Sequence, residues 1–180
     1  MRLVKTLPLL LSLGSALGSV SAWALPTDRD QPIHIQSDDA QLDDKQGVAV
    51  YRGNVIITQG TMKITGNTVT ITRNAQGDID TFTSVGNLAY YEQKPALDKP
   101  IVQGYGKTIQ YFSAQNRIIL IDQAKVINDG NTSEGEKIVY DTVKQVVNAG
   151  RANGTKITAP RPRIDMVIQP KSKTEQQQGK

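Results

Sequence analysis

The sequence contains no cysteine, and histidine occurs only once, at position 34. Without cysteine the chain can form neither disulfide bonds nor the thiolate ligands of structural zinc sites. A single histidine cannot build a histidine-rich metal site. No serine stands in the G-x-S-x-G motif of a nucleophile elbow, and His34 is the only imidazole that could act as its base. We therefore expect no metal, no cofactor and no enzymatic activity.

Concentrated charge of one sign is also missing. The 21 basic residues outnumber the 17 acidic ones only slightly, and they are spread along the chain. This distribution does not predict nucleic-acid binding. The acidic pairs Asp38-Asp39 and Asp43-Asp44 lack the spacing of a calcium loop, so we expect a solvated acidic connection there. The segment 104–107 (Gly-Tyr-Gly-Lys) lacks the spacing of a phosphate loop and is interpreted as a turn.

The only long apolar run lies at the N-terminus. Arg2 and Lys5 precede an apolar stretch over residues 7–20, and Ala22-Trp23-Ala24 supplies small residues at the −3 and −1 positions of a cleavage site. This pattern predicts a secretory signal peptide over residues 1–24, and it is too short for a membrane span. Cleavage after Ala24 leaves a mature chain that begins at Leu25 and has lost the only tryptophan. Cleavage after Ala22 is the alternative.

Beyond residue 31, apolar residues alternate with polar ones, and no segment shows the period of a helix. Valine, isoleucine and threonine dominate these segments. A short break between two strand patterns recurs four times, at Gly53-Asn54-Val55, Gly86-Asn87-Leu88, Asp122-Gln123-Ala124 and Gly150-Arg151-Ala152. A strand, a break and a second strand, repeated in this way, predict an all-β fold of stacked antiparallel strands.

The chain is expected to form one β domain over residues 32–168. We expect a mobile segment over 25–31 before it and a disordered tail over 169–180 after it. The first strand is predicted at 32–36 and the last at 164–168, with a longer loop over 92–100. Turns are expected at Gly66-Asn67, 74–77, 113–116 and 128–131. Ile79 and Phe82 break the alternation, which indicates a bulge between them.

Alternation also predicts which side chains share an apolar inner face. These are Ile33, Ile35, Val48, Val50, Val55, Ile57, Ile64, Val69 and Ile71. Arg73 continues the same parity at the end of a strand. Either it is a solvated residue beyond the strand, or its cation contacts an anionic headgroup at the rim of a lipid-filled interior.

Two motifs carry a resemblance to a known family. The segment 30–38 (DQPIHIQSD), and the segment 53–61 (GNVIITQGT) followed by Lys63-Ile64 and Val69, resemble the LptA/OstA-like family of lipopolysaccharide transport. The resemblance implies an open β-jellyroll with an apolar groove and no catalytic activity. It also implies that Ile33 lines the groove near its entry and that Arg73 and Tyr91 are groove or mouth residues.

The same resemblance implies a place and partners. The protein would work in the periplasm of a Gram-negative envelope and bind the lipid A acyl chains of lipopolysaccharide. It would assemble head to tail with itself. Its N-terminal edge would meet an inner-membrane-anchored component of the same fold, and its C-terminal edge an outer-membrane β-barrel translocon.

Two other interpretations fit the strand pattern. The chain could be a monomeric periplasmic carrier of a small apolar ligand, which predicts a closed barrel. It could also be a structural repeat protein that assembles through sheet edges and binds no lipid. The first alternative also predicts a stable monomer. A lipid pull-down would separate both alternatives from the transport bridge.

Overall fold

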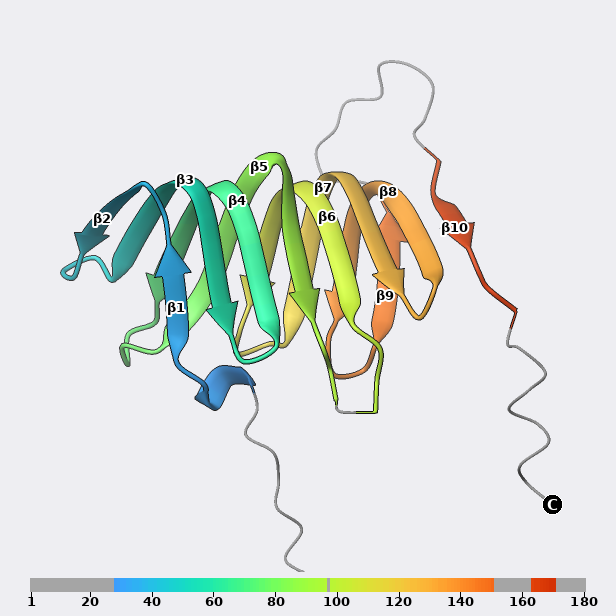
Figure 1. Cartoon of the computed structure of the whole chain (residues 1–180), viewed down its shortest axis with the longest axis horizontal. Helices are drawn as coiled ribbons and strands as arrows, with labels where there is room; N and C mark the ends of the chain where they lie inside the picture. Colours follow the sequence, from blue (N-terminus) through green and yellow to red (C-terminus); the bar gives the residue numbers. More distant parts are fainter. Residues whose placement is uncertain (1–27, 97, 151–162, 171–180) are drawn as a thin grey trace, which may run out of the picture.

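The computed structural model describes residues 28–96, 98–150 and 163–170, and these form an almost purely antiparallel sheet (Figure 1). The one helical element in this part of the chain is a short 3-10 turn, η1 (Asp28–Asp30). The strands are β1 (Ile33–Gln36), β2 (Asp39–Asp43), β3 (Val48–Gln59), β4 (Met62–Arg73), β5 (Ile79–Gln93), β6 (Val102–Phe112), β7 (Arg117–Asn128), β8 (Asn131–Asp141), β9 (Val146–Gly150) and β10 (Asp165–Val167). The expected signal peptide over 1–24 and the part of the expected tail beyond residue 170 lie outside the described residues.

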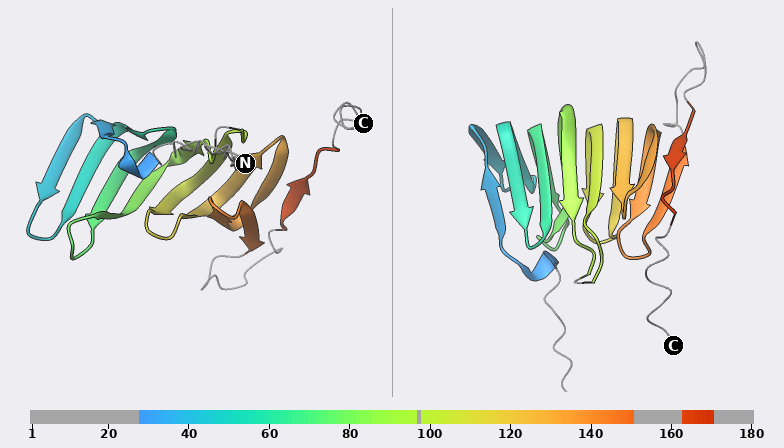
Figure 2. Two further views of the ribbon diagram at one scale, coloured as in Figure 1. Left: turned by 90° about the horizontal axis from the view of Figure 1, so that it is seen from below. Right: turned by 45° about the vertical axis from the view of Figure 1, so that its right-hand side comes forward.

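Six long strands, β3 to β8, pair in chain order, so that each hairpin lies beside the next (Figures 1 and 2). Each long strand is interrupted in register near its middle. The interruptions divide the sheet into two arms. The edge strands of the first arm are β1, which pairs with β3, and β10, which pairs with β8. The edge strands of the second arm are β2 and β9, which pair with the other halves of β3 and β8.

In β3, β5 and β7 the interruption lies where a repeated break was predicted. In β3 the register shifts between Arg52 and Val55, where Gly53 (φ 78°) and Asn54 (φ 44°) are left-handed. Left-handed residues in a strand leave the pairing and bend the sheet. A side chain at Gly53 would also collide with Asp38. The breaks at 86–88 and 122–123 coincide with the shifts in β5 and β7, whereas the fourth break runs beyond the described residues at 151.

Two sequence predictions need correction here. Gly66-Asn67 was expected to be a turn, but β4 continues through it, and the pair forms the bend of that strand. The segment 104–107 was also interpreted as a turn, and it lies inside β6. In both segments glycine marks the point where a long strand bends, which sequence alone does not distinguish from the point where a strand ends.

The other local predictions agree with the structure. Turns connect the strands at 74–77, 113–116 and 128–131. The bulge predicted between Ile79 and Phe82 is present, because Arg73 pairs with Ile79 while Thr72 pairs with Thr81. The acidic connection after Ser37 is more ordered than expected, since it contains the short strand β2.

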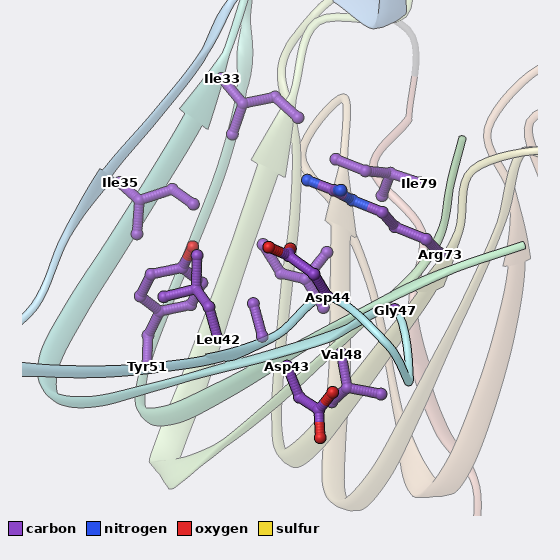
Figure 3. A pocket seen from close by; sticks show the side chains of 12 residues that line it. Ile33, Ile35, Leu42, Asp43, Asp44, Gly47, Val48, Tyr51, Arg73 and Ile79 are labelled. Carbon is purple, nitrogen blue, oxygen red and sulfur yellow. The ribbon is translucent and has the colours of Figure 1, made fainter. Parts of the chain in front are cut away.

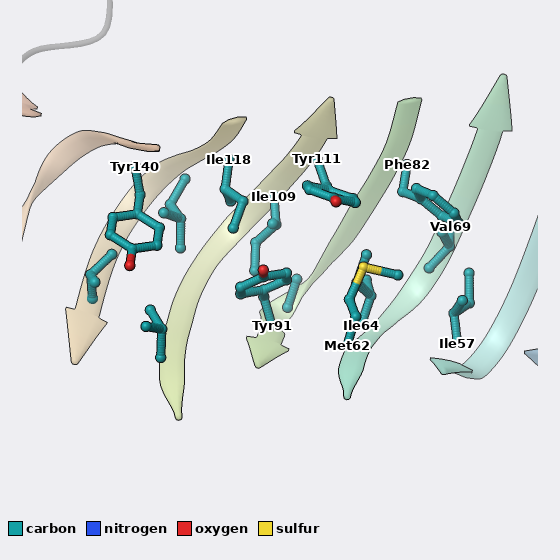
Figure 4. Packing of buried hydrophobic residues seen from close by; sticks show 14 of the residues in the cluster. Ile57, Met62, Ile64, Val69, Phe82, Tyr91, Ile109, Tyr111, Ile118 and Tyr140 are labelled. Carbon is teal, nitrogen blue, oxygen red and sulfur yellow. The ribbon is translucent and has the colours of Figure 1, made fainter. Parts of the chain in front are cut away.

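The core lies between the inner faces of the two arms (Figure 4). It is one continuous cluster, from Ile33 and Ile35 on β1 to Val147 and Ala149 on β9. Side chains from opposite arms meet inside it: the rings of Tyr91 and Tyr111 have their centroids 6.1 Å apart. The middle of the cluster is closed to solvent, as the 0 % exposure of Ile57 and Ile138 shows. The arms therefore form a packed apolar interior.

Candidate functional site

A cavity of about 190 Å³ opens between the two arms at the N-terminal end of the stack (Figure 3). β1 supplies Ile33 and Ile35 from one side, and β3 supplies Ala49 and Tyr51 from the other. Arg73 and Asp44 lie at its rim. This cavity leads directly into the apolar core, because its isoleucines and Tyr51 pack against that cluster.

Most of the apolar residues predicted to face inward do so. Ile33 and Ile35 are half-buried beside the cavity. Deeper in the stack, five others are buried in the core: Val55, Ile57, Ile64, Val69 and Ile71. The structure brings all seven onto one continuous surface.

Val48 and Val50 were assigned to the inner face, and this was wrong. Val48 pairs with Thr72 and Val50 with Thr70, on the outer face of the second arm. Their neighbours Ala49 and Tyr51 oppose Ile71 and Val69 and face the interior instead. Val48 still borders the cavity at its edge. The prediction placed the β-branched side chains inward on both sides of the Gly53-Asn54 bend, which requires the inward-facing positions to change from even to odd numbers there. In the structure, the odd-numbered residues of β3 face inward on both sides of the bend.

Arg73 and Tyr91 occupy different parts of the site. Arg73 is the last residue of β4, is exposed, and reaches over the cavity near Asp44 of the β2–β3 turn (Figure 3). Its backbone amide donates to the carbonyl of Gly47 at 2.8 Å, which fixes the rim. Tyr91 is buried in the middle of the core, where its hydroxyl donates to the side chain of Gln93. Tyr91 is therefore not a mouth residue in this structure.

A second feature lies along the line where the strand ends of the two arms face each other, opposite the bends. We call this line the open seam. A cavity of about 710 Å³ runs along it and is lined from both arms, by residues that include Thr61 and Gln93 on the first and Asn116 and Thr142 on the second. Sequence reasoning did not find the seam, because its residues come from four turns that are far apart in the chain.

The N-terminal residues Asp28–Gln31 cross this seam, and we call them the strap. The Asp28 carboxylate accepts from the amide of Thr61 at 2.7 Å and from Gln93 Nε2 at 2.6 Å, both on the first arm. The Arg29 guanidinium donates to Asn116 Oδ1 on the second arm. Residues 28–31 belong to the segment expected to be mobile, but these contacts tie them to both arms.

Gln59 anchors the strap from inside. Its side chain is only 8 % exposed, and its Nε2 donates to the carbonyls of Arg29 and Gln31 at 3.1 Å each. A buried amide needs such partners, since leaving it unpaired costs about 1–3 kcal/mol. A glutamine on the inner face of an apolar strand pattern was the sequence signal that could have indicated this contact.

Near the seam the interior contains a cluster of tyrosine rings (Figure 4). Tyr91, Tyr111 and Tyr140 lie close to the ends of β5, β6 and β8. Burial raises the pKa of the Tyr111 hydroxyl, while the neighbouring Arg29 opposes that shift. Burial, followed by the nearby Asp141 carboxylate, raises the pKa of Tyr140 to about 12. The interior is thus aliphatic near the bends and amphipathic near the seam.

Among the described residues, no three His, Cys, Asp or Glu side chains gather as a possible metal site. Within the same residues, no helix is long and apolar enough to cross a membrane. The site consists of the apolar interior, its mouth at the N-terminal end, and the strapped seam.

Comparison with known proteins identifies this architecture. Residues 34–146 match the family model described as LptA/(LptD N-terminal domain) LPS transport protein. The chain belongs to this LptA/LptD N-terminal domain family. One relative is the lipopolysaccharide export system protein LptH of Pseudomonas aeruginosa. It is 66 % identical over 175 residues, which cover 97 % of this chain and 100 % of LptH. The lipopolysaccharide export system protein LptA of Escherichia coli K12 is 34 % identical over 155 residues, or 85 % of this chain and 83 % of LptA.

A solved structure extends the family assignment to the fold. The crystal structure of LptH, described as the LptA-homologous periplasmic component of the lipopolysaccharide transport device of Pseudomonas aeruginosa, superposes with a TM-score of 0.74. The match has 66 % sequence identity and covers 81 % of this chain and all of the solved one. The predicted all-β jellyroll of an LptA-like protein is confirmed.

Proposed function

We infer that this chain is a periplasmic component of lipopolysaccharide transport, which holds acyl chains between its two arms and bridges the inner and outer membranes. The observation that carries the inference is the single apolar cluster that runs through the whole stack, with a mouth at one end. A path for acyl chains needs an unbroken dry surface, because each methylene exposed to water costs about 0.8 kcal/mol. The names of the relatives support the same function.

The path is packed shut in this structure. Ile57, Val69 and Phe82 are fully buried by their neighbours, and the cavity at the mouth holds far less than a multi-chain lipid. Lipid can enter only if the arms move apart and acyl carbons replace the side-chain contacts. Such an exchange has no directional requirement, since hydrophobic and dispersion contacts are not directional. We propose that loading separates the two arms, starting at the seam.

A closed carrier is less compatible with the topology. β1 and β2 at one end of the sheet do not pair with β9 and β10 at the other, so the sheet does not close into a barrel. Each end presents strands with an unpaired edge, which is a template for strand addition. We propose that copies join head to tail through these ends. Such a heterologous contact does not close on itself, so the number of copies depends on concentration.

The two ends of the sheet would bind different partners. We propose that the end formed by β1 and β2 receives lipid from an inner-membrane-anchored component of the same fold. The end formed by β9 and β10 delivers it to an outer-membrane β-barrel translocon. We further propose that the protein has no catalytic activity, uses no cofactor and binds no nucleic acid. The cleaved signal peptide over 1–24 remains a prediction.

The test compares the two faces of one strand pair. Ile33 lies beside the mouth, whereas Ile56 lies on the outer face of the same arm, opposite Gln36. A photocrosslinking amino acid at position 33 should capture lipopolysaccharide in cells, and the same probe at position 56 should not. Likewise, Ile33→Asp should keep the β circular-dichroism spectrum and weaken lipopolysaccharide binding, and Ile56→Asp should leave binding intact. Equal capture at both positions would contradict an interior path.

A further inference from the structure

One hydroxyl in the closed interior has no partner. Tyr140 is 1 % exposed, and its Oη finds no hydrogen-bond partner among the described residues. Its two counterparts near the seam are engaged: the Tyr91 hydroxyl donates to Gln93, and the Tyr111 hydroxyl interacts with Arg29. Arg117 Nε is the other buried side-chain atom of the described residues without a partner, and it lies in a guanidinium that stacks on Phe112 at 5.0 Å.

The environment of Tyr140 makes this lone hydroxyl costly. Its neighbours on the adjacent strands are Ile118 on β7 and Val147 on β9, which offer no polar side-chain atom. A buried hydroxyl without a partner destabilises a protein by about the cost of desolvating it, and phenylalanine would fill the same space without that cost. A bridging water would need two or more polar partners, and Ile118 and Val147 provide none. The Tyr91 hydroxyl on the other arm is near enough to interact with Tyr140, but it already donates to Gln93.

The position of Tyr140 matches a particular chemical group. It is the second-last residue of β8, so it lies at the seam side of the interior, below the aliphatic layer near the bends. A lipid that inserts its acyl chains toward the bends leaves its headgroup at the seam. The carbonyl groups that join chains to headgroup then come to rest at the level of the tyrosine rings. A carbonyl oxygen accepts hydrogen bonds and has no proton to donate.

We propose that the Tyr140 hydroxyl donates a hydrogen bond to an acyl carbonyl oxygen of the lipid held between the arms. This rests on the proposed function, and it assigns Tyr140 a polar contact that fixes how deep the lipid sits. Because burial raises the pKa of Tyr140 to about 12, the hydroxyl keeps its proton across the neutral range and remains a donor.

The test pairs two ligands with two proteins. The ligands are dioctanoyl phosphatidylglycerol, which has two ester carbonyls, and its dioctyl ether analogue, which has none. The proteins are the full mature chain and Tyr140→Phe. Tyr90→Phe is the matched control, because it removes a hydroxyl that donates to Glu92 on the outer face, away from the core cluster. Affinities come from isothermal titration calorimetry, and circular dichroism and thermal unfolding confirm the fold of each variant.

We expect the wild-type protein to bind the ester lipid about three- to tenfold more tightly than the ether, the range of one net hydrogen bond. Tyr140→Phe should bind both lipids equally, at the wild-type affinity for the ether, and should unfold at the same or a higher temperature. Tyr90→Phe should keep the ester preference and unfold at a lower temperature, since it loses the hydrogen bond to Glu92.

The outcomes separate this proposal from the one beneath it. If the wild type binds both lipids equally, or if Tyr140→Phe retains the ester preference, Tyr140 does not contact a carbonyl, and the lipid path itself still stands. If the wild-type protein binds neither these lipids nor lipopolysaccharide, the proposal that lipid lies between the arms is wrong, and so is the proposed Tyr140 contact. The comparison of ligands on the wild-type protein decides the matter even if a variant folds poorly.

Discussion

The strap across the open seam should be held in place by Gln59, and the variant Gln59→Leu isolates that effect. Leucine keeps the approximate volume of a side chain that is 8 % exposed, and it removes the donor of two hydrogen bonds to the carbonyls of Arg29 and Gln31. Each net hydrogen bond contributes about 0.5–1.5 kcal/mol. The strap should therefore lose about 1–3 kcal/mol of local stability, while the strand pairing of β3 remains.

Hydrogen exchange measures this loss at single amides. The Thr61 amide donates to the Asp28 carboxylate at 2.7 Å, so it is protected only while the strap is closed. A loss of about 1–3 kcal/mol lowers its protection roughly 5- to 150-fold, since 1.4 kcal/mol corresponds to a factor of ten. Amides in the middle of β4 to β7 should keep wild-type protection, because the two hydrogen bonds that Gln59 loses go to the strap and not to those strands.

A matched control is available on the outer face. Gln110 lies on β6 between Thr83 and Ile119, away from the strap, and Gln110→Leu makes the same chemical change there. It should leave the protection of Thr61 within about twofold of wild type, as surface substitutions usually have small effects. If Gln59→Leu also leaves the exchange protection of the Thr61 and Gln31 amides unchanged, then the two hydrogen bonds do not hold the strap, and other contacts close the seam.

Four further outcomes follow from the structure. Tyr51→Asp should weaken lipopolysaccharide binding in a pull-down, whereas Val50→Asp on the outer face should leave binding within about twofold of wild type. If Val50→Asp weakened binding and Tyr51→Asp did not, Val50 would face the interior, as the sequence alone had predicted. Deleting residues 160–180 removes β10 and should reduce concentration-dependent light scattering without loss of β circular dichroism; undiminished scattering would exclude β10 as an assembly edge. The folded pKa of Tyr140 lies near 12, above the usual 10, so its contribution to stability is complete below pH 10 and should be lost between pH 10 and 12. A transition in absorbance at 295 nm that is complete by pH 10 in the folded protein would contradict this. The exported protein should begin at Leu25 and lack tryptophan fluorescence, and an intact mass that retains the signal would refute cleavage.

Alternation was a reliable guide wherever a strand half was considered alone. Val55 and Ile57, or Val69 and Ile71, were assigned correctly, because one buried face imposes a period of two on each arm. The repeated Gly-Asn and Asp-Gln breaks also predicted where the strands bend. These are local properties of consecutive residues, and at Gly53-Asn54 they include the left-handed conformations that glycine and asparagine adopt at low cost.

Parity across a bend is not local, and there the prediction failed. β3 keeps its parity through Gly53-Asn54, whereas β4 changes it at Gly66-Asn67, with Ile64 and Val69 both buried. The difference depends on how many residues each strand inserts opposite its neighbour, which is settled by pairing between strands. For the same reason the strap and the seam could not be predicted, since their contacts join Asp28 to Thr61 and Gln93, and Arg29 to Asn116.

The layered interior offers a physical account of how one structure can be stable when empty and still accept a lipid. Near the bends, aliphatic side chains such as Val55, Val69 and Ile109 pack against one another. Acyl carbons that replace the opposing side chains there would make the same kind of apolar contact. Near the seam the closing contacts are polar and few: the strap, held by Gln59 and by Asp28, and the tyrosine rings behind it. These contacts are the ones that a hydrated headgroup and its carbonyls can replace. The easiest place to open such a molecule is therefore the seam, and the part that must stay dry is the part farthest from it.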